Sequence, residues 1–506
     1  MISKIYTIAL VGLQGELVEV EVDIRPGLFR FNIVGLPDKA VTESRERVAS
    51  AITNSGFAMP NKKITVNLAP AELIKTGSSY DLPIAVGILA ATKQITPPPS
   101  SDIIWGELSL NGDTRDTTGA LAVADSLLRL NRNTFILPVI NAQEAGIIEG
   151  IKLIPTKNLA MIVDHYAGKT NIIWTRNSEK YKSPETYSYD FKNIVGQEEA
   201  KRVLEIAAAG GHNVLLTGSP GSGKTYLARG LPSIMPRLSY EEVIDVSKIY
   251  SISGLLKKGE LVATRPFRSP HHTSSKVSIV GGGSFPKPGE VTLAHRGILF
   301  MDEFNEFDSK TLEALRQPIE DKVVNISRVA GAMCYPANFM LIAALNPCKC
   351  GYLDDDSNDC ICSSFEIEKY KRKISGPIID RIDLQLNIKR VDNDKLINLS
   401  LAESSSDIRA RVEKARGVQL SRYQSLGYRG VYSNSDLTNT LITKNTKLSM
   451  GSKELLRSSM DALKLSARSY FRVLKVARTI ADLASDVQIQ EQHIAEALSY
   501  RLELGN

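Results

Sequence analysis

The sequence predicts a multidomain α/β protein with an α+β domain, a central α/β domain and an all-helical domain, in that order. Three observations carry this prediction. The 506 residues are too many for one hydrophobic core. A glycine-rich turn, "GSPGSGKT", follows a buried apolar run in the middle of the chain, as after the first strand of an α/β sheet. The carboxyl-terminal part keeps its apolar residues at helical spacing.

The domain boundaries follow from changes in composition. We place the domains at residues 1–175, 190–390 and 391–506. Residues 176–189, "RNSEKYKSPETYSY", are polar and have no hydrophobic period, which is typical of a linker. After "NIKRVDNDKL" the sequence becomes charged and helical, and this change marks the start of the last domain.

The first domain mixes strand and helix signals. Short β-rich runs, "ITVNLAP", "DIIWGELSLNG" and "TFILP", predict strands. Residues 38–56 predict a helix that is capped by Asp38 and ends at a glycine, and residues 81–93 predict a second helix. The domain is therefore predicted to be α+β, with a core of its own.

Composition excludes several classes of protein. No run of about eighteen apolar residues predicts a membrane span. The amino terminus alternates like a strand and lacks a signal-peptide core, so we expect a cytoplasmic protein with reduced thiols and no membrane partner. The net charge of +6 permits a nucleic-acid partner without requiring one.

The motif G-x-x-x-x-G-K-T predicts an ATP site. Backbone N–H groups of such a loop surround a phosphate at a helix start. Lys224 would reach the β- and γ-phosphates, and the Thr225 hydroxyl would ligate Mg²⁺. A chance glycine loop is the alternative, which the strand before it and the helix after it disfavour. The motif consists of Gly218, Ser219, Pro220, Gly221, Ser222, Gly223, Lys224 and Thr225.

Two further strands end in polar residues. "RGILFMDEF" places Asp302 and Glu303 at a strand end, where Asp302 would hold Mg²⁺ and Glu303 would polarise the attacking water. Solvated acids are the alternative for this pair. "NFMLIAALNP" ends in Asn346, whose amide would orient that water. Downstream, Arg381 stands between Asp380 and Asp383, and a structural ion pair is its alternative to a catalytic role.

Four of the five cysteines lie in "CKCGYLDDDSNDCIC". Four thiolates suit a closed tetrahedral site for structural Zn²⁺. The C-x-C spacing is tighter than the common C-x-x-C, so free reduced thiols, a redox pair or an iron–sulfur cluster remain alternatives. Cys334 stands apart and is predicted to be a small buried apolar residue. The predicted zinc ligands are Cys348, Cys350, Cys360 and Cys362.

Several longer motifs carry a family resemblance. "GSPGSGKT", "RPFRSPHHTSSKVSIVGGG", "PKPGEVTLAHRGILFMDE", "LEALRQPIEDKVVNISR" and "SGPIIDRID" resemble the AAA+ ATPases related to the magnesium-chelatase motor subunit, within the ComM/YifB branch of competence-associated proteins. The resemblance covers nearly the whole chain. It implies a central P-loop AAA+ domain with a helical lid. It also makes Asn346 a sensor, Arg381 an arginine finger acting on a neighbouring subunit and Arg468 the second sensor, in a homohexameric ring.

The family also carries insertions that project into the ring channel. Here they resemble "FRSPHHTSSKVSIVGGGSFPKPGEV" and "EDKVVNISRVAGAMCYPA". Positive and hydrogen-bonding groups on such loops suit a DNA backbone, which needs no base reading. The alternative is that the two histidines are structural, because a proline precedes them. The candidate DNA contacts are Arg265, Arg268, His271, His272, Lys276 and Lys287.

The first domain resembles the Lon protease domain. On that alignment Ser79 takes the place of the nucleophile, and Leu121 takes the place of the lysine base. A leucine cannot deprotonate a serine. We therefore expect a non-catalytic domain that serves assembly or substrate handling.

The resemblance implies an ATP-driven ring that moves DNA. It implies helicase action and branch migration on recombination intermediates during natural transformation, with single-stranded and branched DNA and recombination proteins as partners. ATP, Mg²⁺ and structural Zn²⁺ are the expected cofactors. A chelatase-type motor that remodels a protein and an ATP-dependent protease or chaperone are the alternatives.

Overall fold

The computed structural model describes most of the chain. The described residues are 2–174, 187–257, 260–283, 287–328, 331–353, 355, 358–391, 402–428, 430–446, 448–462 and 465–501. Of the predicted linker at 176–189, only residues 187–189 are among them. The chain forms two compact units, which are described separately. The first consists of Met1–Tyr181, Val243–Val262 and Ser327–Met333, and the second of Lys182–Glu242, Ala263–Ile326 and Cys334–Asn506.

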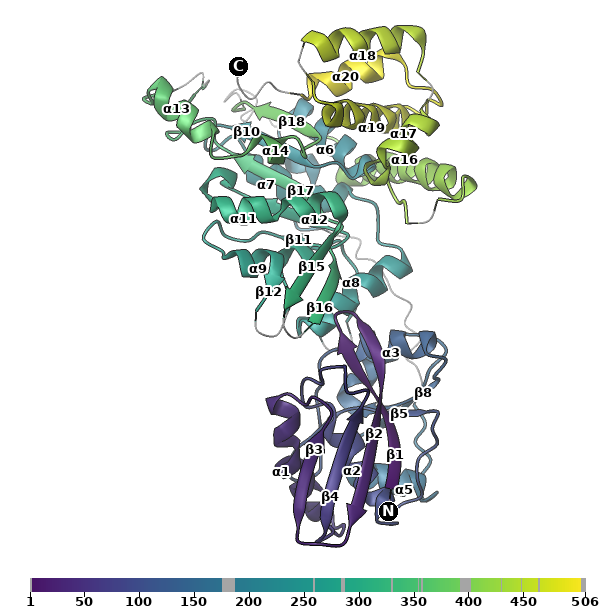
Figure 1. Ribbon diagram of the computed structural model, residues 1–506. Coiled ribbons are helices and arrows are strands. Elements are labelled where there is room, and N and C mark those ends of the chain that lie inside the picture. Colours follow the sequence, from purple (N-terminus) through teal and green to yellow (C-terminus); the bar gives the residue numbers. More distant parts are fainter. Residues whose placement is uncertain are drawn as a thin grey trace. The chain divides into compact units, whose positions relative to one another are not determined.

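A seven-stranded mixed sheet organises the first unit (Figure 1). Its order is β3-β4-β2-β1-β5-β8-β9. The β1–β2 and β2–β4 pairs are antiparallel, and the remaining neighbours are parallel. The strands are β1 (Ile2–Val11), β2 (Gln14–Arg25), β3 (Arg30–Val34), β4 (Lys63–Ala69), β5 (Asp102–Ile104), β8 (Thr134–Pro138) and β9 (Lys152–Thr156). A small hairpin adds β6 (Glu107–Leu108) and β7 (Thr114–Arg115).

Helices of the first unit pack on this sheet in two apolar clusters. One cluster joins α1 (Lys39–Asn54), α2 (Asp81–Ala91) and α5 (Leu159–Tyr166) to the strands, and the other contains α3 (Ala120–Arg129) and part of α4 (Ala142–Ala145). Asp38 caps α1 by accepting a hydrogen bond from the Val41 backbone N–H at 2.8 Å, as predicted. Helix α8 (Tyr240–Ile252) begins in the second unit and continues into the first.

The second unit is built on a five-stranded parallel sheet. Its order is β11-β14-β17-β10-β18, with every neighbouring pair parallel. All residues of β10, β14 and β17 are buried, which is typical of a sheet covered on both faces. The strands are β10 (Val214–Gly218), β11 (Phe267–Arg268), β14 (Ile298–Met301), β17 (Met340–Leu345) and β18 (Leu384–Ile388).

Further helices and two small hairpins lie in this part of the chain. One apolar cluster runs from α6 and the sheet into the carboxyl-terminal helices, where α16 and α19 pack on α6 (Figure 1). The helices beside the sheet are α6 (Glu198–Gly210), α7 (Lys224–Ile234), α9 (Lys276–Val280), α10 (Glu290–Leu293), α11 (Ser309–Ala314), α12 (Arg316–Asp321), α13 (Ser364–Lys371) and α14 (Gly376–Ile379). The hairpins pair β12 (Gly281–Gly282) with β13 (Lys287–Pro288), and β15 (Val323–Arg328) with β16 (Gly331–Pro336).

The carboxyl-terminal part is helical, as predicted. It consists of α16 (Ser405–Ser425), α17 (Asn439–Asn445), α18 (Met450–Ala462), α19 (Ala467–Leu483) and α20 (Glu491–Ser499). The multidomain α/β class with a parallel sheet and a helical end is thereby confirmed. Within the described ranges, none of the helices combines the length and the apolar character that a membrane crossing needs.

Candidate nucleotide-binding site

The loop between β10 and α7 has the backbone of a phosphate-binding turn. Gly221 and Gly223 adopt φ angles of +80° and +92°, which favour glycine. The loop must also begin at a glycine, because a Cβ on Gly218 would lie 2.3 Å from the Ile388 carbonyl oxygen on β18. The N-terminus of α7 starts directly at Lys224, so its free N–H groups face the loop.

The Lys224 ammonium lies inside this loop. Its Nζ donates to the carbonyl oxygens of Gly218 at 2.6 Å and Ser219 at 2.9 Å, and lies 3.4 Å from Asn346 Oδ1. Burial lowers the pKa of Lys224, while Asp302 opposes that shift. A buried ammonium held by carbonyl oxygens is well placed to exchange them for the stronger phosphate contacts.

Oxygen ligands for a divalent cation converge beside Lys224. The Thr225 hydroxyl donates to Asp302 Oδ2 at 2.9 Å, although 77 residues separate them in the chain. Asp302 follows β14 and Asn346 follows β17, and the carboxyl ends of these parallel strands meet at one sheet edge. A hydroxyl and a carboxylate oxygen are ligands that Mg²⁺ prefers, so the side chains fit this ion.

Glu303 adjoins this group and points to a histidine. Its backbone has a φ of +51°, and its side chain is 56% exposed. Glu303 Oε2 lies 3.0 Å from Nδ1 of His272, whose ring packs 4.2 Å from the ring of His271. The structure therefore joins one predicted DNA contact to the predicted water-activating carboxylate.

Arg381 and Arg468 lie together at another place. Arg381 lies three residues before the first residue of β18, and its side chain is only 8% exposed. It donates to the Pro377 carbonyl oxygen at 2.7 Å and to a Glu320 carboxylate oxygen. Arg468, at the start of α19, donates to the other Glu320 oxygen at 2.9 Å. Burial raises the pKa of Glu320, but the hydrogen bond and charge of Arg381 lower it overall, so one carboxylate holds both arginines.

The two arginines lie at the amino ends of the parallel strands, whereas Lys224 lies at their carboxyl ends. Strands β10 and β18 are parallel, with Val214 beside Leu384 and Gly218 beside Ile388. Arg381 precedes Leu384, whereas the phosphate loop begins at Gly218. The strand length between these ends is four residue steps, or about 13 Å at ~3.3 Å per residue. Within one chain, the structure therefore separates these arginines from the P-loop.

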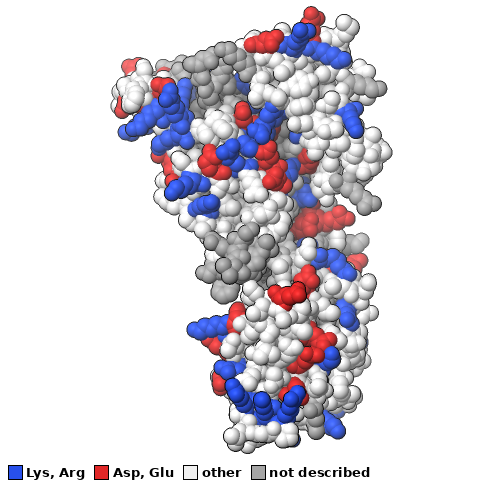
Figure 2. Space-filling model, viewed as in Figure 1, with Lys and Arg blue, Asp and Glu red and all other residues white. Residues whose placement is uncertain are grey.

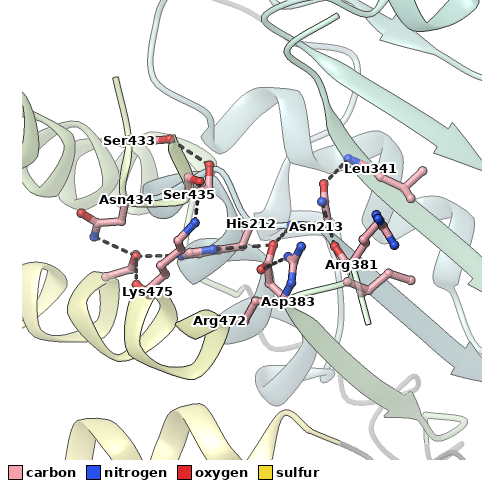
Figure 3. A network of polar contacts seen from close by, with 12 residues as sticks. His212, Asn213, Leu341, Arg381, Asp383, Ser433, Asn434, Ser435, Arg472 and Lys475 are labelled. Atoms are coloured by element: carbon pink, nitrogen blue, oxygen red, sulfur yellow. Dashed lines mark hydrogen bonds and ion pairs between the residues drawn. The ribbon is translucent and has the colours of Figure 1, made fainter. Parts of the chain in front are cut away.

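A buried polar network supports this second edge (Figure 3). Asn213 joins three segments: its side chain accepts from Leu341 N–H at 2.9 Å and donates to the Arg381 carbonyl oxygen at 3.2 Å, and its backbone N–H donates to Asp383 at 2.9 Å. Asp383 also pairs with Arg472 of α19. The predicted alternative for Arg381 was an ion pair with a flanking aspartate, but Asp383 pairs with Arg472 instead and lies 3.8 Å from Nδ1 of His212.

The predicted DNA contacts divide into two groups. Arg265 is 12% exposed and pairs with Glu242 at 3.2 Å, and Arg268 pairs with both oxygens of Glu290 at 2.6 and 2.8 Å. Lys276 and Lys287 are exposed, as is His271, which lies 2.8 Å from the Thr273 hydroxyl. The two arginines thus have carboxylate partners in the fold, whereas the lysines lie at the surface.

The four clustered cysteines converge. The Sγ–Sγ distances from Cys348 are 3.3 Å to Cys350 and 3.6 Å to Cys360, and the Cys350–Cys360 distance is 3.5 Å. All four sulfurs, including Cys362, lie within 4.8 Å of one another. Tetrahedral Zn–S bonds of ~2.3 Å require Sγ–Sγ distances of about 3.8 Å, so the set fits zinc.

Cys334 lies outside this cluster. The prediction that it is buried was wrong, because the residue is exposed. It belongs to β16 of a small hairpin, where alternate side chains point away from the core; the neighbouring Tyr335 is the buried one.

Sequence reasoning missed several residues that organise the site. Glu320 lies in "RQPIED", within one of the motifs that carry the family resemblance, but no role was predicted for it. Asn213 and His212 precede the P-loop strand, and only their polarity beside a buried run could have drawn attention. Their partners lie up to 267 residues away, as for His212 Nε2 and Thr479 Oγ1 at 2.8 Å.

The strand order β11-β14-β17-β10-β18, the P-loop after β10 and the acidic end of β14 define a P-loop ATPase domain of the AAA+ class. Comparison with known proteins identifies a family within this class. The family description "Magnesium chelatase, subunit ChlI" matches residues 190–396, "Subunit ChlI of Mg-chelatase" matches residues 20–141, and "Magnesium chelatase, subunit ChlI C-terminal" matches residues 402–501.

Relatives match almost the full length. The chain is 41% identical over 502 residues to the uncharacterised protein YifB of Salmonella typhimurium and 38% identical over 507 residues to competence protein ComM of Haemophilus influenzae. Each alignment covers 99% of this chain and 97% of the relative. Magnesium-chelatase subunit ChlI of Euglena gracilis is 27% identical over 190 residues, covering 33% of this chain and 55% of that protein. The chain belongs to the ComM/YifB family of magnesium-chelatase-like proteins, within the AAA+ ATPases.

Proposed function

We propose that this protein is an ATP-driven, ring-shaped DNA motor with helicase and branch-migration activity. The observation that carries the ATPase part is the convergence of Lys224, Thr225, Asp302 and Asn346 through hydrogen bonds at the carboxyl edge of one parallel sheet. In this proposal Lys224 contacts the β- and γ-phosphates, and the loop from Gly218 to Thr225 surrounds them. Mg²⁺, when held by Thr225 and Asp302, neutralises phosphate charge.

Glu303 is proposed as the base that polarises the attacking water, with Asn346 orienting it. His272 would restrain Glu303, because their side chains are 3.0 Å apart. His272 also belongs to the segment proposed to contact DNA. A DNA phosphate that draws His272 away would free Glu303, so one histidine would link DNA binding to hydrolysis.

The position of the arginines supports the ring in this proposal. Arg381 and Arg468 lie about a strand's length from their own P-loop, so they serve a phosphate only on a neighbouring subunit. We propose Arg381 as the finger and Arg468 as the second sensor at that interface. A closed ring places every arginine beside a neighbour's nucleotide, and family likeness makes it a homohexamer.

Exposed positive charge supports a DNA load. Lys276 and Lys287 remain proposed backbone contacts together with His271 and His272, whereas Arg265 and Arg268 would have to leave carboxylate partners. Figure 2 shows further Lys and Arg side chains gathered over α13. These exposed residues are Lys369, Lys371, Arg372 and Lys373. Such a surface suits single-stranded and branched DNA without base reading.

The biological setting of this proposal comes from likeness to competence protein ComM. Branch migration of recombination intermediates, in concert with recombination proteins during natural transformation, would use such a motor. We propose that the domain at residues 1–175 is Lon-like and non-catalytic. In support, Leu121 is fully buried in an apolar cluster, where it offers no base to Ser79.

The cysteine cluster is proposed to hold structural Zn²⁺. Four cysteine sulfurs leave no coordination position for water, so the ion would stabilise the loop rather than take part in hydrolysis. Metal analysis of protein prepared without added zinc is expected to give about one zinc per chain. A value near zero, with four titratable cluster thiols, would contradict this part of the proposal.

Strand displacement on a fluorescent four-way DNA tests the main proposal. Wild-type protein with ATP is expected to displace strands, and Lys224→Ala is expected to abolish displacement. Lys453→Ala serves as a matched control, because Lys453 is an exposed lysine of α18. If the wild type hydrolyses ATP but displaces nothing, the motor acts on another load, and the protein-remodelling alternative gains support from the chelatase likeness.

A further inference from the structure

The loop between the two cysteine pairs contacts the P-loop. Cys348 follows Asn346 by two residues and is buried. The chain then turns at Gly351, with a φ of +87°, directly against Pro220 of the P-loop. A Cβ on Gly351 would lie 2.7 Å from Pro220 Cδ, so the close contact requires glycine at this position.

A second contact joins the same two segments. Arg390, just after β18, donates from Nη2 to the Pro220 carbonyl oxygen at 2.9 Å. Its Nε lies 3.5 Å from Asp355 Oδ2, and its guanidinium carbon lies 6.0 Å from the centre of the Tyr352 ring. Asp355 and Tyr352 both belong to the loop between the two cysteine pairs. Arg390 thus connects that loop to the backbone of the P-loop.

We propose that the cysteine cluster positions the P-loop, so that metal occupancy and ATP affinity are thermodynamically linked. The inference rests on the proposed ATP and zinc sites and adds a coupling between them. Zinc bound to Cys348, Cys350, Cys360 and Cys362 closes the loop that carries Gly351, Tyr352 and Asp355. The closed loop then supports Pro220 from one side, while Arg390 ties its carbonyl oxygen.

The physical reason is preorganisation. The P-loop must present several backbone N–H groups to the phosphates at once, and holding it in that shape before binding lowers the cost of ordering. Without zinc, the loop loses the bonds that fix Gly351 against Pro220. ATP must then order both segments. Because the coupling is reciprocal, bound nucleotide must also strengthen zinc retention by the same factor.

The first experiment measures this linkage in the full chain. A fluorescent, non-hydrolysable ATP analogue is titrated into zinc-loaded protein and into protein stripped by a chelator, with circular dichroism to confirm that both are folded. We expect stripping to weaken binding by between about 5-fold and about 150-fold. Zinc release to a colorimetric chelator is expected to slow when the analogue is present. Equal analogue affinity of loaded and stripped folded protein would overturn the inference.

The second experiment keeps the zinc ligands and breaks only the contact. Gly351→Ala places a methyl group against Pro220, whereas Gly427→Ala introduces similar backbone strain at φ +74° with no heavy atom within 4 Å. We expect both variants to retain about one zinc per chain and only Gly351→Ala to bind the analogue at least about 5-fold more weakly. Equal affinities of the two variants would overturn the coupling.

These results are distinguishable from failure of the proposed function. If zinc-loaded wild type does not bind the analogue, the nucleotide site itself is wrong. If it binds the analogue and neither zinc removal nor Gly351→Ala changes the affinity, the nucleotide site stands and only the coupling fails.

Discussion

In the second unit, the two ends of the parallel strands carry different kinds of site. The carboxyl ends of the strands form the carboxyl edge of the sheet, and their amino ends form its amino edge. At the carboxyl edge, Lys224 begins α7 and Asp302 follows β14, and their hydrogen bonds stay within the nucleotide site. At the amino edge, Arg381 and Arg468 share Glu320, and Asp383 pairs with α19. One edge is arranged to bind a nucleotide, and the other to present arginines. In the proposed ring, a complete active site combines the carboxyl edge of one subunit with the amino edge of another, and this difference between the edges is the basis of that proposal.

The largest expected effect tests this division directly. Arg381→Ala is expected to lower the ATPase kcat about 10³-fold, because an arginine finger stabilises charge in the transition state. Mixing Arg381→Ala with Lys224→Ala subunits should restore activity, since some interfaces then combine an intact P-loop with an intact arginine. Arg457→Ala, at an exposed position of α18, is the control. A mixture no more active than its components would refute action in trans.

The next effect concerns the carboxyl edge alone. Glu303→Gln should lower kcat by about 10²-fold while ATP binding persists, because an amide cannot accept the proton of the attacking water. Mixing this variant with Lys224→Ala should restore nothing, since both changes lie at the same edge. Glu306→Gln, at an exposed glutamate of the same loop, should leave kcat unchanged. Recovery on mixing would show that the two edges are not separate in function.

His212 is expected to make the free energy of unfolding depend on pH. The residue is fully buried, and burial, opposed by Asp383 and reinforced by Lys475, Arg416 and Arg472, lowers its pKa to about 4. The unfolded chain binds this proton near pH 6.5 and the folded chain does not. The free energy of unfolding should therefore fall by about 3 kcal/mol as pH drops from 6.5 to 4.

Denaturant unfolding at pH 4.5 to 7 measures this change. His212→Gln should flatten the pH dependence in this window, whereas His271→Gln, at an exposed histidine near the other edge, should leave it as in the wild type. If all three proteins lose stability in parallel, His212 does not carry the effect.

The smallest expected effect lies at Glu320. Glu320→Gln removes the charge that two arginines share and leaves the buried Arg381 with neutral acceptors. Because Glu320 is 44% exposed, solvent weakens the ion pairs, and we expect a loss of only about 1 kcal/mol in the free energy of unfolding. Urea unfolding is compared with Glu454→Gln, at an exposed glutamate of α18. No difference between the variants would mean that Glu320 does not stabilise this edge.

Local signals predicted much of the fold. The buried runs gave β10, β14 and β17, and the capped pattern after Asp38 gave α1. These elements depend on hydrogen bonds and side-chain periods within a few residues, which a single sequence displays. Cys334 was predicted to be buried, and this prediction was wrong. Burial of one residue depends on the register of its strand, and a one-residue shift reverses it.

The sequence by itself determined the chemistry of the carboxyl edge. Spacing within "GSPGSGKT" and acids directly after an apolar strand specify which groups can meet a phosphate and a divalent cation, because parallel strands end side by side. The four cysteines likewise carried their own metal signal.

Only the tertiary structure decided what the second edge contains. Glu320 meets Arg468 across 148 residues, and Asn213 meets Asp383 across 170. The same holds for Gly351 and Pro220. Such pairs follow from the packing of α19 on α6 and from the register of the strands. Side chains throughout the core determine both. No short stretch of sequence contains that information, because each contact depends on where the rest of the chain has folded.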